Sequence, residues 1–137
     1  MKTALDTNIL SSILSNEPGA EQLAWVLGDA LAKGALVVCG PVYSELLAYP
    51  GATPRKIASF LKQGDIAIEY PADPEIWRLA GMKYAGYALR RRKTKEGAPK
   101  RLLADFVIAA HASLHADRLL TLDKGRYRRD FPDLRLQ

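Results

Sequence analysis

Four acidic side chains follow short apolar segments of this 137-residue chain. Asp6 stands in LDTNIL, Glu45 in PVYSELL, Asp105 in LLADFVIAAHA and Asp123 in LLTLD. Clustered carboxylates repel one another and raise one another's pKa unless a cation joins them. The cation that suits an all-oxygen site is Mg²⁺ or Mn²⁺, which can activate a water and offset charge on phosphate oxygens. These residue types predict a metal site for phosphate chemistry, provided that the fold brings the acids together.

Hydrophobic periodicity indicates the elements that must position these acids. We expect strands at residues 3–6, 35–39, 66–70, 118–121 and 134–136. We expect helices at residues 8–14, 21–33, 40–50, 53–64, 73–92 and 101–116. This alternation predicts an α/β fold in which helices cover both faces of a mainly parallel sheet. Ligands of such sheets bind beyond the carboxyl ends of the strands, and the four acids fall at that edge.

Each acid also has an ordinary structural interpretation. Asp6 is a suitable N-cap for the helix that follows it, and the helix dipole favours Asp105 in a first helical turn. Glu45 would be an exposed helical residue. Capping and the dipole do not explain why all four acids fall at one edge of the expected sheet, so we favour the metal site.

The net charge is concentrated in one segment. The chain carries +5 overall, whereas residues 90–101 hold seven cations and one acid, a net of +6. The seven cations are Arg90, Arg91, Arg92, Lys93, Lys95, Lys100 and Arg101. Such a block is typical either of a nucleic-acid surface or of a solvated loop. A second basic cluster at residues 124–129 favours a polyanionic partner, because phosphate contacts supply most non-specific nucleic-acid affinity.

Composition and the absent motifs exclude several classes of protein. The length predicts one domain over residues 1–137, and 48% apolar residues exclude a disordered chain. A single cysteine excludes a disulfide framework. No P-loop, G-x-G-x-x-G or G-x-S-x-G pattern occurs. Because no signal peptide or transmembrane segment is evident, we expect a cytoplasmic protein with no membrane partner.

Several other residues are interpreted as parts of the structure. Cys39 lies in an apolar strand and is expected to be an inert core residue. His111 and His115 are spaced like a zinc-binding pair, but without a clear third ligand we expect them at the core edge or facing outward. Trp25 and Trp77 fall on apolar helical stripes and are expected in the core.

The acidic motifs together resemble a PIN-domain ribonuclease, specifically the toxin of a VapBC-type toxin–antitoxin pair. LDTNIL resembles the first motif of that family and SEL the second. DFVIAAHA is similar to the family's D-x-x-I-A-A-x-A pattern, LLTLDKGRY to its T-x-D segment, and FPDLRL to its C-terminal strand. The motifs extend in order over nearly the whole chain. Residues 50–100 match no motif, and their basic run is heavier than the family pattern, which leaves the choice of substrate open.

The resemblance implies a three-layer α/β/α sandwich and a magnesium-dependent endoribonuclease, with Mn²⁺ as an alternative ion. It carries over Asp6, Glu45, Asp105 and Asp123 as catalytic, metal-binding acids, and Asn8 and Thr121 as supporting polar groups. It also implies an RNA substrate, a homodimer and a cognate antitoxin that occupies the acidic groove.

Two other functions stay open at this point. One is a non-catalytic module that binds RNA or protein through residues 90–101, with the acids in a structural role. The other is a metal phosphatase, which is disfavoured because D-T-N at residues 6–8 lacks the second aspartate of a D-x-D-x-T pattern. Magnesium-dependent cleavage of RNA distinguishes the nuclease from the binding module.

Overall fold

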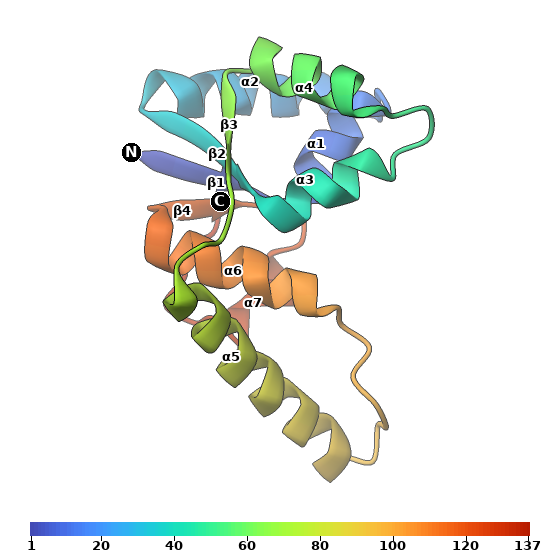
Figure 1. The fold of residues 1–137 in the computed structure, drawn as a ribbon, viewed down its shortest axis with the longest axis vertical. Coiled ribbons are helices and arrows are strands. Elements are labelled where there is room, and N and C mark those ends of the chain that lie inside the picture. Colours follow the sequence, from blue (N-terminus) through green and yellow to red (C-terminus); the bar gives the residue numbers. More distant parts are fainter.

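The centre of the protein is a parallel sheet of four strands, seen in a computed structural model that describes residues 1–137 (Figure 1). The strands are β1 (Lys2–Leu5), β2 (Ala35–Cys39), β3 (Ile66–Glu69) and β4 (Arg118–Leu120). They lie in the order β3-β2-β1-β4, and every pairing is parallel. The carboxyl ends of the strands therefore meet at one edge of the sheet, as predicted.

Helices cover both faces of this sheet. They are α1 (Thr7–Leu14), α2 (Ala20–Ala32), α3 (Gly40–Leu47), α4 (Pro54–Gln63), α5 (Pro74–Lys93), α6 (Leu103–His115) and α7 (Lys124–Arg128). In Figure 1, α1 to α4 lie on one side of the sheet and α5 to α7 on the other. This three-layer arrangement confirms the predicted α/β fold class. None of the helices has the length and apolar character needed to cross a membrane.

The core forms where α6 packs between the sheet and α5. Every residue from Asp105 to Ala112 in α6 is buried, as expected of a helix that is apolar on nearly all sides. In β2, the four residues from Leu36 to Cys39 are buried in succession, which is the pattern of a parallel strand covered on both faces. Asp105 therefore lies near the start of a closely packed helix, which holds its carboxylate in place.

The C-terminal segment differs from the prediction. The strand expected at residues 134–136 is reduced to a single bridge between Leu119 and Leu136, because the chain is still turning after Phe131. Two backbone hydrogen bonds extend this pairing: the N–H of Leu119 donates to the carbonyl of Arg135, and the N–H of Gln137 donates to the carbonyl of Leu119. The helix α7 is not predicted from the sequence, since five residues are too few to show a helical period.

Two tryptophans lie at the surface and not in the core, contrary to expectation. Trp25 is 73% exposed, because α2 turns a different stripe, which includes the buried Ala30, toward the protein. Trp77 is half-exposed, and its indole N–H donates to the carbonyl of Pro71 at 2.7 Å. Cys39 is buried as expected, and burial raises the pKa of its thiol to about 12. The thiol therefore stays protonated and unreactive.

Candidate functional site

Asp6 stands where β1 passes into α1, at the carboxyl edge of the sheet. Its backbone N–H donates to the carbonyl of Leu120 at 3.0 Å, which fixes it beside β4. Its side chain caps α1, because Oδ1 accepts from the N–H of Thr7 at 2.8 Å. The residue is only 3% exposed. Asp6 therefore serves as an N-cap and also presents a buried carboxylate, so its two sequence interpretations are compatible.

Two hydroxyl groups hold the other carboxylate oxygen of Asp6. Thr121 Oγ1 and Tyr127 Oη donate to Oδ2 at 2.8 and 2.9 Å. Asn8 joins this group, since its Nδ2 donates to Thr121 Oγ1 at 3.4 Å and its Oδ1 accepts from the N–H of Leu122 at 3.2 Å. Asn8 and Thr121 therefore lie beside the first acid, where supporting groups are expected.

Glu45 and Asp105 lie near enough to Asp6 for their charges to interact. Burial raises the pKa of Asp105; nearby arginines lower it, and the charge of Asp6 raises it further. Burial also raises the pKa of Glu45. A hydrogen bond from the hydroxyl of Thr7 to Oε1, at 2.9 Å, lowers this pKa, whereas repulsion from Asp105 and Asp6 raises it further. The structure thus gathers three mutually repelling carboxylates at the carboxyl edge of the sheet.

Asp123 lies at the rim of these three acids, with a half-exposed side chain. Its Oδ1 caps α7 by accepting from the backbone N–H of Arg126 at 3.1 Å, and its own N–H donates to Thr121 Oγ1 at 3.1 Å. The guanidinium of Arg126 lies between two acids, with Nε 3.3 Å from Asp123 Oδ2 and Nη1 3.6 Å from Asp105 Oδ1. Asp123 therefore reaches the same edge, but its link to Asp105 runs through Arg126.

The chemistry of these donors fits a hard divalent cation. All of them are oxygens, and a cation relieves the repulsion between buried carboxylates. No three acidic, histidine or cysteine side chains stand close enough to enclose an ion. Mg²⁺ does not require such a cage, because it is usually held by one or two carboxylates and keeps several waters. The carboxylates of Asp6 and Asp105, whose charges interact, are the pair that would hold an ion in this way.

Three of the seven cations in the basic run 90–101 are held by acids of the same chain. Arg90 and Arg101 both donate to the buried carboxylate of Asp130, Arg101 at 2.9 Å. Arg91 donates to the carboxylate of Glu96 at 2.9 Å and to a backbone carbonyl at the same distance. These contacts fix the end of α5 and the segment that leads to α6. The run is therefore not simply a solvated loop, and part of its charge is already neutralised.

The other four cations of the run are exposed and form no ion pair within the chain; they are Arg92, Lys93, Lys95 and Lys100. Beside them lies a cavity of about 230 Å³ whose lining includes five arginines: Arg90, Arg91, Arg101, Arg126 and Arg129. Because Arg126 also contacts Asp105 and Asp123, the cavity adjoins the acidic residues. The site therefore combines a carboxylate group with a cationic hollow.

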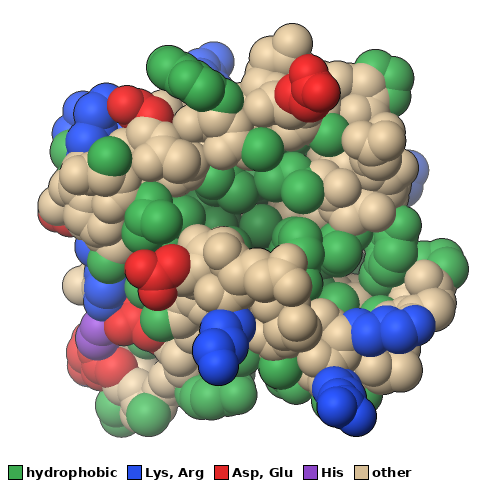
Figure 2. Space-filling model, turned by 90° about the horizontal axis from the view of Figure 1, so that it is seen from above, with side chains coloured by type: hydrophobic (Ala, Val, Ile, Leu, Met, Phe, Trp, Pro, Cys, Tyr) green, Lys and Arg blue, Asp and Glu red, His purple; other side chains and the backbone are tan.

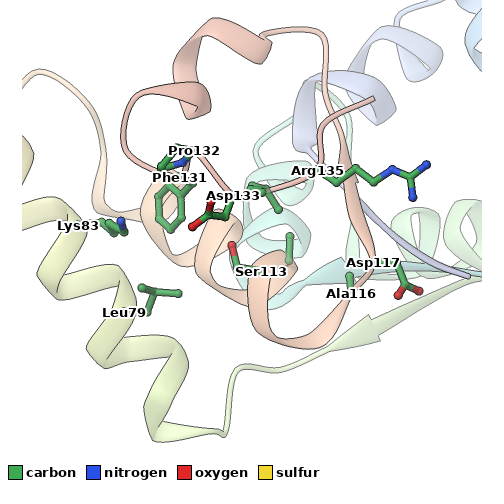
Figure 3. Close-up of a pocket in the computed structure, with 11 residues that line it drawn as sticks. Leu79, Lys83, Ser113, Ala116, Asp117, Phe131, Pro132, Asp133 and Arg135 are labelled. Atoms are coloured by element: carbon green, nitrogen blue, oxygen red, sulfur yellow. The ribbon is translucent and has the colours of Figure 1, made fainter.

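Two other hollows lie away from the acids. One of about 340 Å³ lies among α1, α2 and α4, and its hydrophobic side chains form the floor of the depression in Figure 2. Another of about 270 Å³ lies between α5, α6 and the C-terminal segment, and Lys83, Asp133 and Arg135 line it (Figure 3). Neither hollow contains any of the acids expected from the sequence to bind a metal ion.

Each of the two histidines contacts a different acidic side chain. His111 is buried, and its Nε2 lies 3.1 Å from Oε1 of Glu69. His115 is nearer the surface, with Nε2 2.9 Å from Oδ2 of Asp73. The pair therefore lies at the edge of the core, as expected, and each ring has its own carboxylate partner.

Sequence reasoning missed three residues that organise this site. Tyr127 and Arg126 contact the acids from α7, and Asp130 holds two arginines of the basic run. The local signals are the basic cluster at residues 124–129, which contains Arg126, and the aromatic residue that ends DKGRY, four positions after Asp123. Neither its burial nor its partner can be read from that position, because Asp6 lies at the other end of the chain.

Comparison with known proteins identifies the family and the fold. Residues 3–132 match the family described as "PIN domain". VapBC-1 from nontypeable Haemophilus influenzae is similar over 100% of this chain and 97% of that chain, with a TM-score of 0.66 and 23% identity. FitAcB from Neisseria gonorrhoeae is similar over 98% and 95%, with a TM-score of 0.63 and 24% identity. A toxin–antitoxin complex from Klebsiella pneumoniae is similar over 96% and 91%, with a TM-score of 0.60 and 20% identity.

No curated protein matches the chain. At these identities, the three solved structures indicate a shared fold. The match to the family description is independent of them and extends from β1 to the turn that follows α7. Because that match spans nearly the whole sequence, the chain belongs to the PIN-domain family.

Proposed function

We propose that this protein is a Mg²⁺-dependent endoribonuclease and the toxin component of a toxin–antitoxin pair. The observation that carries the proposal is the grouping of Asp6, Glu45 and Asp105 at the carboxyl edge of the sheet, with the pKa values of two of them raised. Buried acids with perturbed pKa values are typical of functional sites. Family membership supports a nuclease, and the toxin assignment rests on the fold shared with toxin–antitoxin proteins.

Asp6 and Asp105 would hold the ion, and Glu45 and Asp123 would complete the site directly or through waters. When bound, Mg²⁺ supplies charge compensation and an activated water for hydrolysis of the phosphodiester. The hydroxyls of Thr121 and Tyr127 fix the Asp6 carboxylate, as hydrogen bonds around metal-binding groups commonly do. No side chain of the site is an evident general base, so the acids act by holding the ion and orienting the water.

The arginine-lined cavity beside the acids is the proposed path of the RNA backbone. Phosphates are the groups that such a cavity attracts, and these contacts give affinity without base specificity. Arg92, Lys93, Lys95 and Lys100 would contact phosphate directly. Arg90, Arg91 and Arg101 would act mainly by holding this segment in place, since their guanidinium groups are engaged with acids of the chain.

The protein partners proposed are a cognate antitoxin and a second copy of this chain. The structure from Klebsiella pneumoniae is described as a toxin–antitoxin complex, and this chain shares its fold. The hydrophobic hollow among α1, α2 and α4 supports a protein partner, because exposed apolar surface of this kind marks interaction sites. An antitoxin guanidinium placed among the acids would compete with the metal for the same carboxylates.

Cleavage of RNA by the purified chain, with Mg²⁺ and with EDTA, tests the nuclease. We expect Asp105→Asn to lower the cleavage rate by about a hundredfold or more, the scale of losing an essential electrostatic group. Its melting temperature should stay the same or rise, because the substitution removes a repelling charge. Asp65→Asn is the matched control, since Asp65 is exposed and asparagine tolerates its positive φ of 53°.

Two results would contradict the proposal. One is cleavage that persists in EDTA, and the other is an Asp105→Asn variant as active as Asp65→Asn. Binding of RNA without any cleavage in Mg²⁺ or Mn²⁺ would instead support the non-catalytic module that binds through residues 90–101.

A further inference from the structure

Arg126 is a cation of the chain itself that lies among the proposed metal ligands. Its Nη1 is 3.6 Å from Asp105 Oδ1, and its Nε is 3.3 Å from Asp123 Oδ2. Asp105 belongs to α6 and Asp123 to the loop after β4, so Arg126 contacts both of these segments. A guanidinium offers several donors in a rigid plane and can therefore engage two carboxylates at once.

The same side chain also faces the cationic cavity. Arg126 lines that cavity together with Arg90, Arg91, Arg101 and Arg129, and its side chain is 39% exposed. Its guanidinium therefore lies between the acids and the cavity. Arg90 and Arg101, in contrast, are held by the buried Asp130.

Neither contact of Arg126 with the acids is a close, well-aligned pair. Both distances exceed the 2.7–2.9 Å that is usual for a charge-assisted hydrogen bond. Partly exposed ion pairs of this kind are weak, because solvent screens them. A divalent ion on the same carboxylates interacts with twice the charge and would displace the guanidinium.

We propose that Arg126 acts as a built-in counter-ion that competes with the divalent metal for Asp105 and, once displaced, binds a phosphate of the RNA backbone. This inference rests on the proposed function and adds an order of binding: the metal binds first and frees the Arg126 guanidinium, which then binds the RNA. Two consequences follow. Removing the charge of Arg126 strengthens metal binding. It also reduces the increase in RNA affinity that follows when the metal is added.

Calorimetric titration of Mn²⁺ into the RNA-free protein tests the competition. We expect Arg126→Gln to bind Mn²⁺ about tenfold more tightly than the wild type, a modest factor because the pair is screened. Arg126→Lys keeps the charge and should stay within about threefold of the wild type. Arg129→Gln is the matched control, because Arg129 lines the same cavity without contacting the acids, and its Mn²⁺ affinity should be unchanged.

Fluorescence anisotropy with a phosphorothioate RNA, with and without Mn²⁺, tests the transfer to phosphate. Wild-type affinity for the RNA should rise on adding Mn²⁺, and Arg126→Gln should lose most of that rise. Arg129→Gln should weaken RNA binding equally under both conditions. An Arg126→Gln variant that binds Mn²⁺ no more tightly than the wild type, or that keeps the full rise, overturns the inference.

The controls separate this failure from failure of the proposed function. If the wild type binds Mn²⁺ and Asp105→Asn does not, the metal site stands and only the role of Arg126 is in question. If the wild type binds no Mn²⁺, or Asp105→Asn binds it equally well, the proposed metal site is wrong and the inference fails with it.

Discussion

The loss of the Asp130 carboxylate should destabilise the fold strongly, although the chemical change is small. Asp130→Asn keeps the size of the side chain and removes one charge. The carboxylate is 3% exposed and accepts from both Arg90 and Arg101, whose side chains are 35% and 18% exposed. Arg101 has no better alternative, because its Nε and Nη2 are already buried without a partner. The substitution therefore leaves a buried guanidinium uncompensated.

The size of the effect follows from this burial. Removing one partner of a buried ion pair costs about 3–5 kcal/mol, and the partial exposure of Arg90 favours the lower figure. Arg101 keeps some stabilisation from the ring of Phe106, whose centroid lies 4.5 Å from its guanidinium carbon. An unfolding entropy of about 2.1 cal/mol/K per residue gives roughly 0.29 kcal/mol/K for a chain of 137 residues. A loss of about 3 kcal/mol therefore lowers the melting temperature by about 10 °C.

Calorimetric melting of the two purified proteins, with urea unfolding as a second measure, checks this value. Asp133→Asn is the control, because it removes the same charge three residues further on from an exposed side chain without an ion pair. We expect the control to melt within about 2 °C of the wild type, as is usual for surface substitutions. If Asp130→Asn loses less than about 1 kcal/mol, the two arginines do not depend on this carboxylate, and the reasoning from burial is wrong.

Two further predictions concern the metal and the RNA. The pKa values of Asp105 and Glu45 are raised in the folded state, so the metal-free protein loses stability as the pH rises from their unfolded to their folded pKa values. Bound Mg²⁺ removes that loss of stability. The increase in melting temperature caused by Mg²⁺ should therefore be small near about pH 4 and grow toward about pH 8. Thermal scans over this range check it, and an increment that is independent of pH would contradict it. Replacing Arg92, Lys93 and Lys95 by Gln should lower the slope of log affinity for single-stranded RNA against log salt by about 0.7 for each lost phosphate contact. The same loss of charge at Arg55, Lys56 and Lys62 of α4 should leave that slope unchanged, and equal slopes in all three proteins would identify the run as a solvated surface.

The sequence was sufficient to predict the four strands of the sheet, six of the seven helices and the edge of the sheet where the acids meet. Regular hydrophobic patterns identify β2 and the buried helix α6, since neither depends on a distant partner for its period. The position of Asp6 directly after an apolar strand likewise predicts that it caps the following helix and lies at the carboxyl edge of the sheet. The acids could therefore be placed from local patterns and one rule of topology.

The remaining features depend on contacts between distant parts of the chain. Asp130 pairs with Arg90 across 40 positions, and Tyr127 donates to Asp6 across 121. No periodicity encodes such pairs, and a short helix such as α7 gives too weak a signal to orient its side chains. For the same reason, the count of charges in residues 90–101 omits Asp130, which the fold brings beside Arg90 and Arg101.

The short segment from Asp123 to Asp130 contacts two of the clustered acids and two arginines of the basic run. Tyr127 is fully buried and donates to Asp6, whereas Arg126 next to it faces the solvent and contacts Asp105. Adjacent residues of a helix point to different sides, so α7 presents a buried donor and an exposed cation in two successive positions. Asp130, two residues after the end of α7, holds two of the five arginines that line the cavity. One short segment therefore contacts both the carboxylates and the cationic cavity.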